Sequence, residues 1–132
     1  MKYFSRMDDI KKWYTTESAL YYTGGDKRWL RDKIRWQRLV GPEDSNNLIF
    51  GIAELDPGET HLLHKHSDAA ELYLVLEGEG LFRVNDEERF CEKGHCIYSP
   101  PGASHRVHNN GDQKLVIFFV YDRPWYNTEL EE

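Results

Sequence analysis

Short apolar runs separated by turn signals about every ten residues most constrain what this chain of 132 residues can fold into. The runs begin at Ile34, and Leu115–Tyr121 is apolar on both faces, as a central strand would be. Proline fixes φ in the intervening turns, and glycine accepts positive φ. The turn signals are Asp56-Pro57-Gly58-Glu59, Glu77-Gly78-Glu79-Gly80, Asn85-Asp86, Lys93-Gly94, Pro100-Pro101-Gly102 and Asn109-Asn110-Gly111-Asp112. This spacing predicts an all-β sandwich or barrel, and the last signal predicts a hairpin into 115–121.

Residues 1–33 differ in character, being rich in Trp, Tyr, Lys and Asp. Asp8 or Asp9 is expected to cap a short helix through Lys11–Tyr14, and Gly24-Gly25 to interrupt the chain after it. We therefore divide the chain into a partly helical N-terminal arm, residues 1–33, and a β-barrel with a C-terminal tail, residues 34–132. The aromatic side chains of the arm are expected to cover the barrel or a partner subunit, and the second arrangement predicts a homodimer.

Charge and hydropathy exclude some functions. The formal net charge is −6 with no dense basic patch, which argues against nucleic acid as a partner. No run of eighteen apolar residues is present, and Asp8 and Asp9 fall where a signal peptide would be apolar. We expect a cytoplasmic protein that does not cross a membrane, with Cys91 and Cys96 as reduced thiols.

Four residues in two segments form a candidate metal site. His64 and His66 are two apart in a predicted strand, so both imidazoles leave the same face. Glu71 starts the next strand, and His105 opens a later strand after a Pro-Gly turn. Three imidazoles and one carboxylate suit one divalent transition metal, namely Fe, Mn, Ni, Co or Zn.

Strand alternation also predicts which neighbours share the cavity. A single histidine in a strand is more often packed or solvated than a metal ligand, so the face that each side chain takes matters. Tyr73 should point inward with Glu71, and Val107 with His105. By the same alternation, His61 should point out of the barrel and away from the cavity. The remaining histidines are expected to lie outside the ligand set: His61, His95 and His108.

The two segments resemble the two motifs of the cupin superfamily. The first motif is matched by Gly58, His64, His66, Glu71 and Gly78, and the second by Gly94, Pro100, Gly102, His105 and Asn109. The resemblance covers roughly residues 34–121 and implies a double-stranded β-helix, or jelly-roll barrel, with the metal inside. Many cupins carry Asp after the glycine that opens the second motif, where this chain has His95.

The element Glu71-Leu72-Tyr73 resembles, less closely, that of the cupin-type dimethylsulfoniopropionate lyases. That resemblance implies a substrate carboxylate bound at the metal, with Glu71 and Tyr73 as catalytic residues. Tyr73 would remove the α-proton, releasing dimethyl sulfide and acrylate. Those lyases often have three residues between the second histidine and the glutamate, whereas this chain has four.

Cupins host many functions, so three remain open. A metal-dependent lyase or isomerase would bind a small, carboxylate-bearing molecule and abstract a proton. An iron dioxygenase would consume oxygen with its substrate. A non-catalytic binding or sensing module would bind metal and ligand without forming product.

Overall fold

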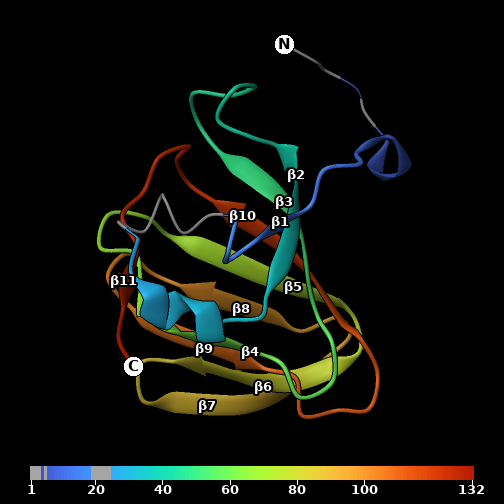
Figure 1. Ribbon diagram of the computed structural model, residues 1–132, viewed down its shortest axis with the longest axis vertical. Helices are drawn as coiled ribbons and strands as arrows, with labels where there is room; N and C mark the ends of the chain where they lie inside the picture. Colours follow the sequence, from blue (N-terminus) through green and yellow to red (C-terminus); the bar gives the residue numbers. More distant parts are fainter. Residues whose placement is uncertain (1–3, 5, 19–24) are drawn as a thin grey trace.

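The computed structural model describes residue 4 and the ranges 6–18 and 25–132, and it is built mainly of β-strands. Two short 3-10 helices, η1 (Met7–Asp9) and η3 (Lys27–Arg31), belong to the arm (Figure 1). The strands are β1 (Tyr14–Thr15), β2 (Arg35–Val40), β3 (Ile49–Leu55), β4 (Thr60–Lys65), β5 (Glu71–Glu77), β6 (Glu79–Val84), β7 (Glu87–Glu92), β8 (Cys96–Ser99), β9 (Ser104–His108), β10 (Leu115–Tyr121) and β11 (Glu129–Leu130).

The strands form two antiparallel sheets that face each other across the core. One sheet has the order β1-β2-β3-β10-β5-β8, and the other has the order β11-β4-β9-β6-β7. From β3 to β10 the chain passes back and forth between the sheets, with only the β6–β7 hairpin staying within one sheet. This alternation is the double-stranded β-helix, so the predicted all-β jelly-roll fold is confirmed.

Local sequence explains much of this order. The pair Asn85-Asp86 closes the β6–β7 hairpin, and Asn85 takes the positive φ of 52° that such a two-residue turn requires. The apolar β10 lies between β3 and β5, as its sequence predicts for a central strand. Cys91 and Cys96 are both free thiols. No helix within the described ranges is long and apolar enough to cross a bilayer.

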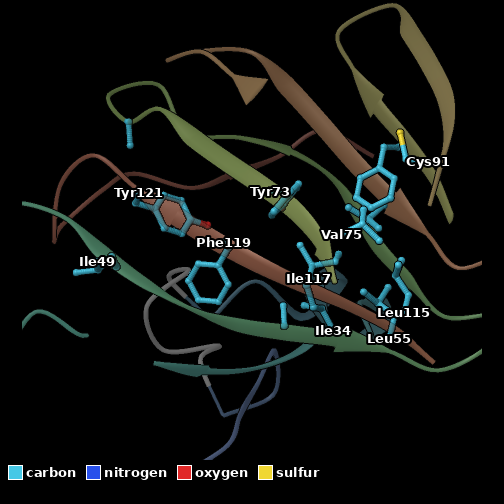
Figure 2. Packing of buried hydrophobic residues seen from close by; sticks show 14 residues of the cluster. Ile34, Ile49, Leu55, Tyr73, Val75, Cys91, Leu115, Ile117, Phe119 and Tyr121 are labelled. Atoms are coloured by element: carbon cyan, nitrogen blue, oxygen red, sulfur yellow. The ribbon is translucent and has the colours of Figure 1, made fainter. Parts of the chain in front are cut away.

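The core is mainly aliphatic toward one end of the barrel, the aliphatic end, and mainly aromatic toward the other, the aromatic end. Leu55, Leu115 and Ile117 are fully buried and pack together with Val75 at one end of the barrel (Figure 2). Tyr73, Phe119 and Tyr121 lie toward the other end, on the inner side of β5 and β10 (Figure 2). The aliphatic end fixes the packing of the two sheets, which leaves the aromatic end available to line a cavity.

Two local predictions are wrong. The helix through Lys11–Tyr14 is absent, because η1 ends at Asp9 and Tyr14 instead pairs with Trp36 in the sheet. The two rings stack with centroids 5.9 Å apart, a tertiary contact that outweighs helix propensity. The break predicted at Gly24-Gly25 falls partly outside the described residues, and the domain division at residue 34 stays a prediction.

The hairpin predicted at 109–112 is also wrong, since β9 and β10 belong to different sheets. Asn109 is fully buried, and its side-chain amide donates hydrogen bonds to the carbonyl oxygens of Leu55 and Gln113. Its side-chain oxygen accepts one from the Gly111 amide. These contacts anchor a crossing between the sheets rather than a turn within one of them.

Candidate metal centre

The four residues of the candidate metal site converge inside the barrel from separate elements. His64 lies on β4 and His66 directly after it, Glu71 begins β5, and His105 lies on β9. All four side chains are buried, and their candidate ligand atoms all lie within 4.8 Å of one another. Ligand atoms bound to one ion at about 2.1 Å are at most about 4.2 Å apart, so shifts of a few tenths of an ångström would close the site.

Sheet register accounts for this convergence. His64 pairs with His105 across β4 and β9, which places their rings on the same inner face, with centroids 4.1 Å apart. Glu71 comes from the opposite sheet, where it pairs with Ser99 of β8 and Tyr121 of β10. The site therefore spans the space between the two sheets and depends on both.

Each imidazole is oriented by a hydrogen bond at Nδ1. His64 donates to the carbonyl oxygen of Leu62 at 2.6 Å, and His66 donates to that of Asn127 at 2.9 Å. His105 Nδ1 lies 3.1 Å from the hydroxyl of Ser99. With Nδ1 engaged in this way, Nε2 of each ring faces the centre as a lone-pair donor, which is how metal-binding histidines are held.

The ring nitrogens and the carboxylate oxygen that face the centre of the site test whether a cation fits there. Glu71 Oε1 and His105 Nε2 lie only 2.9 Å apart, yet among the described residues neither has a partner in hydrogen-bonding geometry. His66 Nε2 is 3.5 Å from the same carboxylate oxygen. Buried polar atoms without partners are costly. A divalent cation between them would satisfy these atoms, and the residues fit the metal that the motifs imply.

Electrostatics favour the metal-binding protonation states of His64 and Glu71. Burial, together with the neighbouring histidines His105, His61 and His66, lowers the pKa of His64 well below its ordinary value. Burial alone would raise the pKa of Glu71, but His105 and His66 outweigh it and hold that pKa far below its usual range. A neutral imidazole and an ionised carboxylate are the forms that coordinate a cation.

A cavity of about 160 Å³ is lined by three of the four residues, His64, His66 and Glu71. Tyr73, Phe119 and Tyr121 line it from the barrel, and Tyr126 lines it from the C-terminal tail. The hydroxyl of Tyr73 is buried and has no hydrogen-bond partner among the described residues. Burial and the Glu71 carboxylate raise the pKa of Tyr73 well above its ordinary value, so the phenol carries its proton in the absence of a cation.

Several cavity residues do not follow from the motifs. His61 lines the cavity although alternation predicts it outside, and its Nδ1 lies 2.6 Å from Asp32 Oδ2. Trp29 of the arm packs edge-on against His64, with ring centroids 5.6 Å apart. Arg38 of β2 also lines the cavity. Of these, only His61 carried a sequence signal, as the histidine three residues before His64.

Comparison with known proteins establishes the family. A family model described as Cupin domain matches residues 51–121, just over half of the chain. An uncharacterized protein of Methanocaldococcus jannaschii is 36% identical over 97 residues, covering 72% of this chain and 78% of that protein. The chain belongs to the cupin family.

Two further relatives have named activities. An oxalate-binding protein of Thermotoga maritima is 30% identical over 92 residues, covering 68% of this chain and 76% of the relative. The dimethylsulfoniopropionate lyase DddW of Ruegeria pomeroyi is 31% identical over 75 residues, covering 55% of this chain and 49% of that enzyme. The match to the lyase therefore spans about half of that enzyme.

Solved structures agree with this fold. The crystal structure of a Thermotoga maritima protein titled a predicted oxalate decarboxylase superposes with a TM-score of 0.64 at 28% identity. The match covers 69% of this chain and 81% of that one.

Proposed function

We propose that this cupin is a metal-dependent lyase or isomerase that acts on a small carboxylate-bearing molecule by proton abstraction. The observation that carries the proposal is the buried cluster of His64, His66, Glu71 and His105 beside a cavity into which Tyr73 projects. The named relatives, an oxalate-binding protein and a dimethylsulfoniopropionate lyase, support a small acid as ligand.

In this proposal the three histidines and Glu71 hold one divalent ion of Fe, Mn, Ni, Co or Zn. Such an ion, when bound, supplies Lewis-acid chemistry that acidifies a C–H bond beside a coordinated carboxylate. Tyr73 Oη is the proton-transfer group. Positive charge among the four ligands counteracts the Glu71 carboxylate, which otherwise keeps the phenol protonated, so the base should work only in the metal-loaded protein.

The rest of the cavity binds the substrate and excludes water. Phe119, Tyr121 and Tyr126 supply apolar walls, and Tyr121 and Tyr126 stack with centroids 4.1 Å apart. A volume of about 160 Å³ is close to that of a buried cavity known to hold benzene, so the substrate should have roughly six to ten non-hydrogen atoms. That size fits a short-chain acid.

Replacing Tyr73 with Phe tests the catalytic role. Each metal is restored to the purified protein, small acids are screened for turnover, and the variant is then assayed with any substrate found. Tyr73→Phe should abolish turnover while metal content, measured by elemental analysis, stays unchanged. Tyr98→Phe, at an exposed position on β8, is the matched control. Full turnover by Tyr73→Phe would refute the role of Tyr73.

Ligand binding without turnover is the second candidate, favoured by the relative that is named for binding oxalate. It predicts that the metal-loaded protein binds small acids but forms no product under any condition. Oxygen consumption with substrate in the Fe(II) form, lost under anaerobic conditions, would instead identify a dioxygenase.

We also propose a homodimer in the cytoplasm. Phe50, Leu72 and Phe118 point to the outer face of the six-stranded sheet, and Leu72 is exposed. Phe50 and Phe118 pack together there, with centroids 5.8 Å apart. An apolar outer face of this kind supports burial against a second copy. Sedimentation analysis should give twice the chain mass, and Leu72→Asp should reduce it to that of one chain.

A further inference from the structure

Arg38 lies on the inner face of the barrel, in line with the candidate base. Across the sheet, Arg38 pairs with Gly51, Gly51 with Phe119, and Phe119 with Tyr73. Paired residues in neighbouring strands share a face, so all four positions look toward the interior. Gly51 has no side chain, and Arg38, Phe119 and Tyr73 all line the cavity.

The charge of Arg38 has no protein counterion. Every Asp and Glu of the chain lies within the described ranges, and none of them forms an ion pair with this guanidinium. Arg35, three residues earlier on the opposite face of β2, pairs with Glu54, Asp56 and Glu59. In a chain of net charge −6, an arginine that faces a cavity and has no acidic partner marks a place for an anion.

The arm and the tail fix the position of Arg38. Its guanidinium lies over the ring of Tyr14, 4.7 Å from the centroid, and Tyr14 itself stacks on Trp36. On the side of the tail it is near Tyr126, where its positive charge acts to lower a phenol pKa that burial and Glu71 raise to about 12. A guanidinium that stacks on the face of one aromatic ring can still use its in-plane N–H groups for a bidentate contact.

We propose that Arg38 is the anion-binding, specificity-determining residue of the cavity, and that the substrate is a small acid with two anionic groups. One carboxylate would lie at the cluster formed by His64, His66, Glu71 and His105, and the other on the Arg38 guanidinium. The inference rests on the proposed function, because it takes the first carboxylate to be held at the metal. It also disfavours a substrate whose far end is cationic, as in dimethylsulfoniopropionate, since Arg38 would repel that end.

Binding of two probe acids tests this assignment. The protein is loaded with Mn(II), and the affinities for malonate and propionate are measured by calorimetry. Malonate can also chelate the metal through both carboxylates, so the quantity of interest is the part of its preference over propionate that depends on Arg38. That part should be about 10- to 100-fold, the effect of one charge-assisted bidentate contact. Arg38→Met, which replaces the guanidinium by an unbranched apolar side chain, should lose this part of the preference while its Mn content stays unchanged. Arg89→Met removes the same charge from an exposed site on β7 and should keep the preference.

The possible failures can be told apart. If the wild-type protein takes up no metal, the proposed function is wrong and this inference falls with it. If metal is bound but malonate shows no advantage, or if Arg38→Met keeps the full wild-type advantage, only the role of Arg38 is refuted. If Arg38→Met does not fold, Arg38→Lys is used instead, because lysine keeps the charge but lacks the paired N–H donors of the guanidinium. This variant should lower the malonate preference several-fold. An unchanged preference would equally refute the role of Arg38.

Discussion

At the scale of single residues, His105 is held in the candidate site by contacts with residues of both sheets. Its Nε2 faces Glu71 at 2.9 Å, its Nδ1 is oriented by Ser99, and its ring lies beside that of His64. Because two of these contacts are with other candidate ligands, Glu71 and His64, removing its ring should affect metal binding more than the fold.

His105→Ala should lower metal affinity by at least about 100-fold, since even partners that only orient a ligand are worth about 10- to 100-fold. Elemental analysis after dialysis should show occupancy falling well below one ion per chain. His108→Ala is the matched control, because His108 lies on the same strand and its Nδ1 is 2.7 Å from the hydroxyl of Thr60. Equal metal content in both variants would contradict the assignment of His105.

Asp32 is a second residue whose environment makes a definite prediction. Its Oδ1 accepts from the hydroxyl of Thr16 and the amide of Ile34, and its Oδ2 accepts from the amide of Leu62. The Nδ1 of His61 lies 2.6 Å from the same Oδ2. Burial acts to raise the pKa of Asp32, but His61 and the backbone donors outweigh it and lower that pKa.

Asp32→Asn should destabilise the fold by about 2 kcal/mol at neutral pH. The side-chain NH₂ group of asparagine would replace one carboxylate oxygen and would face two hydrogen-bond donors that then lose their acceptor. A carboxyl whose pKa is lower in the folded state stabilises above its unfolded pKa, and that contribution is lost as pH falls through the folded value. The stability gap between wild type and Asp32→Asn, from urea unfolding, should therefore shrink below about pH 4. A gap that stays constant with pH would contradict this account.

At the scale of elements, an irregularity in β4 decides which histidines meet. His61 pairs with Val107 and His64 with His105, so three steps along β4 match two along β9. This bulge inserts one residue and puts His61 and His64 on the same face, with ring centroids 4.2 Å apart. The expectation that His61 lies outside the cavity is wrong for this reason, since simple alternation assumes an unbroken strand.

The contact between β2 and β3 requires a glycine at position 51. A Cβ built there would lie 1.9 Å from the carbonyl oxygen of Gln37 and 2.9 Å from the ring of Phe119. The two strands could not keep this separation with any larger residue.

Gly51→Ala should cost at least about 3 kcal/mol of unfolding free energy, since the clash involves backbone. Gly58→Ala makes a useful comparison, because a Cβ at this position meets nothing within 4 Å and only its φ of +85° is unfavourable. The second variant should lose about 1 kcal/mol. Chemical unfolding would measure both, and an equal cost would mean that β2 and β3 can separate readily.

At the scale of the whole molecule, the candidate ligands lie within the matched cupin segment, while much of the cavity wall comes from outside it. Residues 51–121 contain all four ligands. Trp29, Arg38 and Tyr126, which precede or follow that segment, line the cavity. The tail also reaches the site directly, because the carbonyl oxygen of Asn127 accepts from His66. Substrate selectivity should therefore reside in the flanking segments, and metal binding in the shared core.

Because the site joins both sheets, metal binding should stabilise the entire fold. An ion present at 100 times its dissociation constant should raise the free energy of unfolding by about 2.7 kcal/mol. Thermal unfolding with Mn(II), and again after chelation, would measure this shift. His105→Ala should show little response; an equal response in that variant would place the bound ion elsewhere.

The sequence by itself determined the strands, most of the turns and the four candidate ligands. These follow from alternation over a few residues and from the φ preferences of Gly, Pro and Asn, which act locally. Only the tertiary structure decided that His61 and Arg38 face the cavity, that Asn109 anchors a crossing between sheets, and that Tyr126 returns over the site. Those features depend on strand register, on one bulge and on contacts between segments far apart in the chain. No local pattern encodes them, because their energy is gained only once the two sheets have come together.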